Sequence, residues 1–90
     1  MELPDGIVVV VKHDCPTCVV VEPVLGQLAA ELGDELHVFS QDDPSFPSTV
    51  PDVGDDTGLD LSWRLELTTV PTLIKVEHGK ELERLEGWMR

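Results

Sequence analysis

IVVVVKHDCPTC, residues 7–18, contains both cysteines of this 90-residue chain, directly after its longest β-branched run. Residues 7–11 predict a strand that is buried on both faces and therefore central in a sheet, because every side chain in the run is apolar. In residues 16–32 apolar side chains recur at three- and four-residue intervals, which is typical of a helix. Cys15 thus lies on the turn between strand and helix, and Cys18 lies one turn into the helix.

This position favours reactive chemistry at Cys15. The backbone N–H groups and the dipole at a helix N-terminus stabilise a thiolate, which is the nucleophilic form of cysteine. The sequence neighbours act in opposite directions, since Asp14 repels a thiolate and a protonated His13 attracts it. Cys18 is close enough to close a disulfide with Cys15. We therefore interpret Cys15 as the candidate nucleophile and Cys18 as the thiol that resolves the mixed disulfide.

Three residues shape the expected helix. Pro16 fits its first turn, where the missing N–H leaves no bond unmade. Gly33 is a plausible C-terminal stop. Pro23 falls inside the helix, where its ring clashes with the preceding turn and predicts a kink.

Beyond this helix the pattern predicts three further strands and a shorter second helix. The strands are residues 36–39, 72–77 and 81–86, and the helix is residues 59–67 with Thr57 or Asp60 as its N-cap. The first of these strands follows the long helix closely, so we expect it to pair in parallel with residues 7–11 through a right-handed connection. The last strand carries many charges, which suits a sheet edge.

Residues 42–58 form an acidic loop that is rich in proline and glycine and has no basic residue. The loop is long for a compact domain. It fits a mobile flap, a partner-binding surface or a tolerated surface insertion equally well.

The composition is that of one folded domain spanning residues 1–90, with 41% apolar and 27% charged residues. No apolar stretch approaches the roughly 20 residues that span a bilayer. Residues 1–5 are acidic and lack the basic start of a signal peptide. We therefore expect a cytoplasmic protein without a membrane partner. The net charge of −12 also argues against nucleic acid and anionic membrane surfaces as partners.

Two close cysteines in a reducing compartment are more often catalytic or metal-binding than a structural disulfide. Zinc takes four ligands, but the histidines His13, His37 and His78 are scattered, so we expect no metal site. We interpret His37 as a structural or surface histidine, and Trp63 and Trp88 as packing residues.

Three further features accompany the Cys15-Pro-Thr-Cys18 motif. Pro23 follows the first cysteine by eight residues, Thr69-Val-Pro-Thr72 precedes an apolar strand, and Glu77-His-Gly-Lys80 matches a hairpin turn. Over residues 7–88 this pattern resembles the thioredoxin/glutaredoxin superfamily. The resemblance implies an α/β, thioredoxin-like fold of order β-α-β-α-β-β, with a mixed four-stranded sheet and helices packed on it.

The family fold usually ends in a helix after its fourth strand, and this chain stops where that helix would begin. We expect the chain to be the N-terminal part of a longer protein. The alternative is an oligomer contact that covers the same face of the sheet.

The resemblance also implies an activity, thiol–disulfide exchange on a protein partner or a fused enzyme. It implies that Pro71 is a cis-proline facing the cysteines, and that the backbone of Val70 pairs with an extended substrate segment. The residues expected to contact the substrate are Pro16, Thr17, Val70 and Pro71. The expected partners are a protein disulfide and an upstream reductase, and the redox-active disulfide replaces any cofactor.

Two departures from the family pattern limit what is carried over. Val9 stands where thioredoxins carry a buried aspartate, so proton transfer at Cys18 must use another group or water. Pro16 resembles glutaredoxins, but their downstream glutathione contacts are absent, so glutathione has no clear site. The alternative function is a binding or adaptor domain of a larger protein, with non-catalytic or metal-binding cysteines; the missing last helix and the acidic loop favour it.

Overall fold

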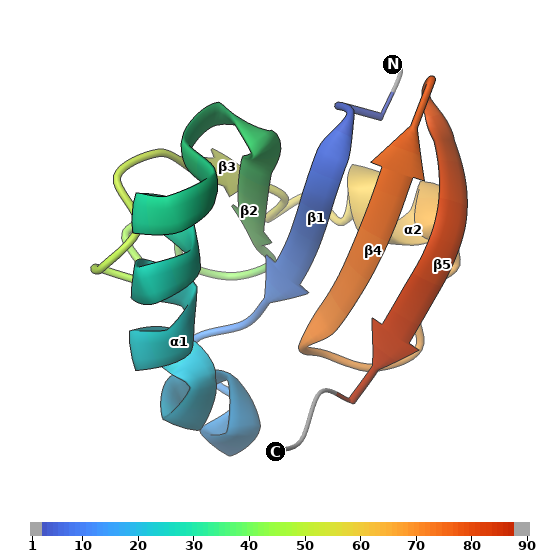
Figure 1. The fold of residues 1–90 in the computed structure, drawn as a ribbon. Helices are drawn as coiled ribbons and strands as arrows, with labels where there is room; N and C mark the ends of the chain where they lie inside the picture. Colours follow the sequence, from blue (N-terminus) through green and yellow to red (C-terminus); the bar gives the residue numbers. More distant parts are fainter. Residues whose placement is uncertain (1–2, 88–90) are drawn as a thin grey trace.

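A five-stranded mixed sheet with one helix on each face forms the domain in the computed structural model, which describes residues 3–87 (Figure 1). The elements follow one another as β1 (Gly6–Val11), α1 (Pro16–Leu32), the 3₁₀ turn η1 (Gly33–Glu35), β2 (Leu36–Ser40), β3 (Val53–Asp55), α2 (Asp60–Leu65), β4 (Thr72–Glu77) and β5 (Lys80–Glu86). The strand order across the sheet is β3-β2-β1-β4-β5. The predicted α/β class and thioredoxin-like arrangement are confirmed.

The β1 strand is the centre of the sheet, as its apolar run predicts. It pairs in parallel with β2, with Val9 opposite Val38, and antiparallel with β4, with Val9 also opposite Leu73. Residues 8–11 are completely buried. Because β1 and β2 are parallel, their carboxyl ends meet at one edge of the sheet, and the cysteine turn leaves β1 at that edge.

The sheet has one strand more than the sequence predicted. The additional strand, β3, lies within the acidic loop of residues 42–58 and pairs in parallel with β2, with Val53 opposite Val38. Gly54 lies opposite Phe39, and a β-carbon at this glycine would collide with the Phe39 ring. A short strand with a central glycine has no apolar alternation, and for that reason the sequence pattern gave no signal for it.

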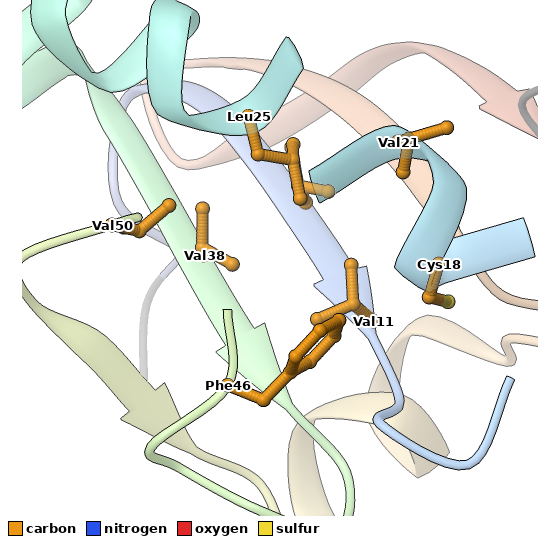
Figure 2. Close-up of a cluster of buried hydrophobic side chains, with 8 residues drawn as sticks. Val11, Cys18, Val21, Leu25, Val38, Phe46 and Val50 are labelled. Carbon is orange, nitrogen blue, oxygen red and sulfur yellow. The ribbon is translucent and has the colours of Figure 1, made fainter. Parts of the chain in front are cut away.

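Two apolar clusters, one on each face of the sheet, form the core, because alternate residues of β1 point to opposite faces. The cluster under α1 contains Val9, Val11, Cys18, Val21, Leu25, Val38, Phe46 and Val50 (Figure 2). The cluster under α2 contains Leu3, Val8, Val10, Leu61, Leu65, Ile74 and Val76. Two members of the first cluster, Phe46 and Val50, come from the acidic loop, so that loop is packed onto the domain.

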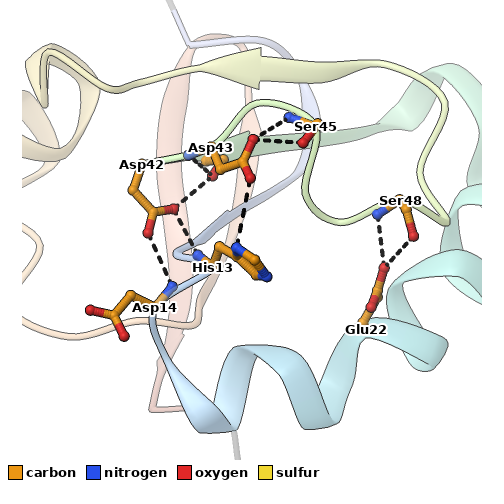
Figure 3. A network of polar contacts seen from close by, with 8 residues as sticks. His13, Asp14, Glu22, Asp42, Asp43, Ser45 and Ser48 are labelled. Carbon is orange, nitrogen blue, oxygen red and sulfur yellow. Dashed lines mark hydrogen bonds and ion pairs between the residues drawn. The ribbon is translucent and has the colours of Figure 1, made fainter.

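The α1 helix has the predicted limits. Pro16 occupies its first turn, Pro23 lies inside it, and Gly33 follows its last residue with φ 55° and an N–H that donates to the carbonyl oxygen of Ala29. On its loop-facing side, the Glu22 carboxylate accepts hydrogen bonds from the backbone N–H and the hydroxyl of Ser48, at 2.8 and 3.0 Å. These bonds fasten the acidic loop to α1 (Figure 3).

The N-cap predicted for α2 is wrong. Neither Thr57 nor Asp60 caps this helix; instead the buried Asp56 carboxylate accepts hydrogen bonds from the N–H groups of Leu61 and Ser62, at 2.8 and 3.0 Å, and from the Ser62 hydroxyl at 2.6 Å. The capping residue therefore precedes both predicted candidates for the helix start. Leu59, at the start of α2, has a left-handed backbone that turns the chain back toward Asp56. The helix is also shorter than predicted, ending at Leu65.

Candidate functional site

Cys15 occupies the N-cap position of α1, as its sequence position predicts. Its backbone is extended, with φ −156° and ψ 109°, and its Sγ accepts a hydrogen bond from the N–H of Cys18 at 3.3 Å. The sulfur therefore replaces the oxygen that usually caps a helix. The Cys15 sulfur therefore faces the end of α1 where the partial positive charge of the helix dipole gathers.

Cys18 lies beneath Cys15 and has no exposed surface, whereas Cys15 is half-buried. The Cys18 Sγ accepts a hydrogen bond from the N–H of Lys12 at 3.4 Å. Burial, with the hydrogen bond and charge of Cys15 adding to it, raises the pKa of Cys18 to about 12. Both thiols are free in this structure, so the geometry is that of the dithiol form.

Selective alkylation should report this asymmetry. The pKa of Cys18 rises from 9.0 to about 12, which lowers its thiolate fraction near neutral pH about a thousandfold. We expect iodoacetamide to label the native domain once, at Cys15, as read by mass spectrometry of the intact protein and its peptides. The Cys15→Ser variant should stay unlabelled until it is unfolded in urea. Rapid labelling of native Cys18 would contradict the described burial.

The Val70–Pro71 loop faces the cysteine turn. The peptide bond between these residues is cis, as predicted, and Pro71 is buried. The Cys15 thiol approaches the carbonyl oxygen of Val70 at 3.7 Å, across a sequence separation of 55 residues. Val70 packs against both core clusters, which fixes its position beside the sulfur. Of the other expected substrate contacts, Pro16 is exposed and Thr17 half-buried in the first turn of α1.

Asp42 is a residue of this site that the sequence analysis did not single out. Its carboxylate accepts hydrogen bonds from the N–H groups of His13 and Asp14, at 2.7 and 3.0 Å, and thereby holds the loop that leads to Cys15 (Figure 3). Ser40 at the end of β2 donates a third, longer bond of 3.4 Å. The sequence did contain a signal for this contact. Because β1 and β2 are parallel, the residues that follow β2, Asp42 among them, lie near the loop that follows β1.

The His13 side chain is turned toward the acidic loop. Its Nδ1 lies 3.6 Å from the Asp43 carboxylate, and its ring centroid lies 4.8 Å from that of Phe46. Within residues 3–87 neither His13 nor Asp14 has a side-chain hydrogen bond to a sulfur. Any influence of these two residues on Cys15 therefore acts through charge and through the backbone held by Asp42.

The Asp42 clamp predicts a pH-dependent stability. Desolvation disfavours the charged carboxylate, but the N–H groups of His13 and Asp14 outweigh it, so the pKa of Asp42 lies below its usual 3.8. A carboxyl whose pKa is lower in the folded state stabilises the fold above 3.8, and this contribution is lost as the pH falls through the folded value. We expect Asp42→Asn to lower the urea midpoint at neutral pH, and the gap from the wild type to narrow as the pH falls below 3.8. A gap of constant size would show that the charge of Asp42 is not involved.

Two expectations about other residues have different outcomes. Trp63 is 85% exposed, so its interpretation as a packing residue is wrong; α2 places it on the outer side of the helix, away from the sheet. Trp88 lies outside the described residues. His37 has the structural contact expected of it, because its Nε2 lies 3.0 Å from the carbonyl oxygen of Asp5.

Within residues 3–87 no group of three or more His, Cys, Asp or Glu side chains is arranged to hold a metal ion. In the same range no helix has the length and apolar character needed to cross a membrane.

Comparison with known proteins agrees with this geometry. A family model described as TraF, F plasmid transfer operon protein, matches residues 4–83. The chain belongs to this family. It is a thioredoxin-like domain, and solved structures of that fold superpose on nearly all of it. No match to the sequence was found among curated proteins.

Two solved structures illustrate the likeness of the TraF-family chain to other proteins. StoA from Bacillus subtilis is 16% identical with a TM-score of 0.72, covering 96% of this chain and 78% of its own. A thioredoxin-2, described as a component of the malaria parasite protein secretion machinery, is 15% identical with a TM-score of 0.61, covering 96% of this chain and 74% of its own. At such low identity these likenesses show the fold alone.

Proposed function

We propose that this thioredoxin-like domain catalyses thiol–disulfide exchange with a protein partner, using Cys15 as nucleophile and Cys18 as resolving thiol. The observation that carries the proposal is the asymmetry of the pair. Cys15 is half-buried at a helix N-cap and lies 3.7 Å from the Val70 carbonyl oxygen, whereas Cys18 is fully buried. An accessible sulfur beside a backbone edge, with a protected second thiol, suits stepwise exchange.

Reduction of a substrate disulfide would take two exchanges. In the first, the Cys15 thiolate forms a bond to one substrate sulfur, the substrate disulfide breaks, and the other substrate sulfur leaves as a thiolate. In the second, Cys18 gives its proton to the thiolate released in the first exchange and attacks the Cys15 Sγ. The bond between Cys15 and the substrate breaks, and the second substrate sulfur leaves as a thiolate. Two electrons have then moved to the substrate, and the domain holds a Cys15–Cys18 disulfide.

The raised pKa of Cys18 suits this order of events. A thiol with a pKa of about 12 stays protonated in the resting domain, so it neither competes for the substrate nor reacts with solvent oxidants. It becomes the attacking group only when the mixed disulfide brings an electrophilic sulfur next to it. The backbone of Val70, beside cis Pro71, would hold the substrate segment during both steps.

Return to the dithiol requires an upstream thiol reductase, which we propose as the second partner. A cytoplasmic location stays a prediction, and it would make reduction of the substrate the favoured direction, because the cytosolic poise keeps such pairs reduced. The proposed chemistry uses the two sulfurs and no bound cofactor.

Single-turnover oxidation tests the proposal without needing the natural reductase. The reduced domain is mixed with a protein disulfide such as insulin, and the loss of free thiols in the domain is followed by alkylation and mass spectrometry. Formation of the Cys15–Cys18 disulfide, with matching reduction of insulin, supports the proposal. A domain that keeps both thiols free while an equal concentration of dithiothreitol reduces insulin would overturn it.

A further inference from the structure

Trp63 is the most exposed large apolar residue among those described, at 85%, and it borders a groove on the α2 side of the sheet. The groove has a volume of about 740 Å³ and is lined on its apolar side by Leu59, Trp63 and Leu67. Leu59 is itself 48% exposed. Exposed tryptophan beside a concave apolar surface is typical of a binding site, because it offers a large rigid contact area at low entropic cost.

Backbone strain points to the same groove. Leu59 and Glu66, the residues at the two ends of α2, both have left-handed backbones, with φ 62° and 56°, and both line the groove. Side chains other than glycine and asparagine seldom adopt this conformation, because the β-carbon crowds the backbone. Such strain persists only where surrounding contacts enforce it, and it gathers at functional sites. Here the Leu59 turn accompanies the buried Asp56 cap at the start of α2, and the Glu66 N–H donates to the carbonyl oxygens of Ser62 and Trp63 at its end.

The groove includes the chain segment that leads into the cis-proline loop. Thr68 lines it and lies two residues before Val70, whose carbonyl oxygen faces the Cys15 sulfur. On the other side, Gln41 lines it and donates from Nε2 to the Ser62 hydroxyl at 2.7 Å. An extended chain advances about 3.3 Å per residue. Two to four residues of a substrate segment that pairs along Val70 and continues past Thr68 therefore cover roughly 7–13 Å.

The charges around this path are predominantly acidic. Asp14, Asp42 and Asp43 surround the cysteine turn, and Glu66 lies in the groove. Within the groove lining Glu66 is balanced by Arg64, so the excess of negative charge lies at the cysteine turn, in a chain with a net charge of −12. Such a field attracts basic segments and repels acidic ones.

We propose that the Trp63 groove binds the substrate segment that follows the reacting cysteine along Val70, and that it selects a basic segment with a large apolar side chain two to four residues from that cysteine. This inference rests on the proposed exchange function and deepens it by naming the chemistry of the substrate. The apolar side chain packs on Trp63 between Leu59 and Leu67, and lysine or arginine residues face the carboxylates of the cysteine turn.

Single-turnover oxidation of the reduced domain by matched disulfides tests this selection. One disulfide-linked peptide carries leucine three residues from its cysteine and two lysines, a second replaces the leucine by alanine, and a third replaces the lysines by glutamates. Hydroxyethyl disulfide, which is small and neutral, reports the cysteine chemistry alone. The variants are Trp63→Ala and, as a matched control, Leu82→Ala on β5, where Leu82 is 50% exposed.

We expect the wild-type rate constant for the leucine peptide to exceed that for the alanine peptide about tenfold, and the glutamate peptide to be the slowest. Trp63→Ala should remove the leucine preference without changing the rate with hydroxyethyl disulfide, and Leu82→Ala should retain the preference. Equal leucine and alanine rates in the wild type, or an unchanged preference in Trp63→Ala, would overturn the groove assignment while exchange itself stands. No reaction with any disulfide, hydroxyethyl disulfide included, would overturn the exchange function and the inference with it.

Discussion

Cys15→Ser is expected to lower the rate of disulfide exchange at least about a thousandfold, because a serine hydroxyl is not ionised near neutral pH and does not form sulfur–sulfur bonds. The remaining thiol does not compensate. Cys18 is fully buried, and its pKa of about 12 leaves it protonated. The measurement is single-turnover oxidation by a protein disulfide, with hydroxyethyl disulfide as a second substrate that needs no groove.

Cys18→Ser is the matched control, and it should behave differently. The nucleophile is retained in this variant, so the first exchange proceeds and a mixed disulfide between Cys15 and the substrate accumulates. Non-reducing electrophoresis with mass spectrometry identifies the linked residue. If Cys15→Ser instead formed the stable adduct and Cys18→Ser did not, the two roles would be reversed. If neither variant formed an adduct, stepwise exchange through this pair would be wrong.

Asp56→Ala should cause the largest loss of stability among substitutions outside the apolar core. The Asp56 side chain is 4% exposed and accepts three hydrogen bonds, two from N–H groups at the start of α2 and one from the Ser62 hydroxyl. Alanine would leave these donors without a partner in a buried site, at a cost of about 3 kcal/mol in the free energy of unfolding. Domains of this size have about 5–15 kcal/mol in total. Urea unfolding followed by circular dichroism measures the difference.

Asp55→Ala provides the comparison at the neighbouring position. Asp55 is exposed, and its carboxylate bonds to the N–H of Thr57 at 2.8 Å. Its replacement should leave the urea midpoint nearly unchanged. Because Asp56 also holds α2, its replacement should in addition weaken the leucine preference ascribed to the Trp63 groove. Equal stability of the two variants would mean that water satisfies the freed donors, and that α2 does not depend on Asp56.

Contacts close in sequence explain why much of the fold was predictable. The run of β-branched residues in β1 gives a doubly buried central strand, since no polar side chain interrupts it. Pro16 and Gly33 mark the ends of α1 because each changes local backbone freedom. The position of Cys15 at the helix start was predictable in the same way, because it follows from the strand pattern before it and the helical spacing after it.

Contacts between distant segments could not be read in this way. Asp42 reaches the His13 and Asp14 backbone only because β1 and β2 end at the same sheet edge, and Asp56 caps α2 only because Leu59 turns the chain back. β3 escaped prediction because a three-residue strand is stabilised by pairing with β2 and by the fit of Gly54 against Phe39.

The sequence by itself determined a central strand, a cysteine N-cap and a cis-proline loop, since each rests on short-range backbone preferences or on a family motif. The tertiary structure decided which carboxylate holds the cysteine turn and that Trp63 lies outside the core. The physical reason is that burial and charge environment depend on every segment packed around a residue, and the segments around Cys15 and Cys18 come from β1, β2, the acidic loop and the start of β4.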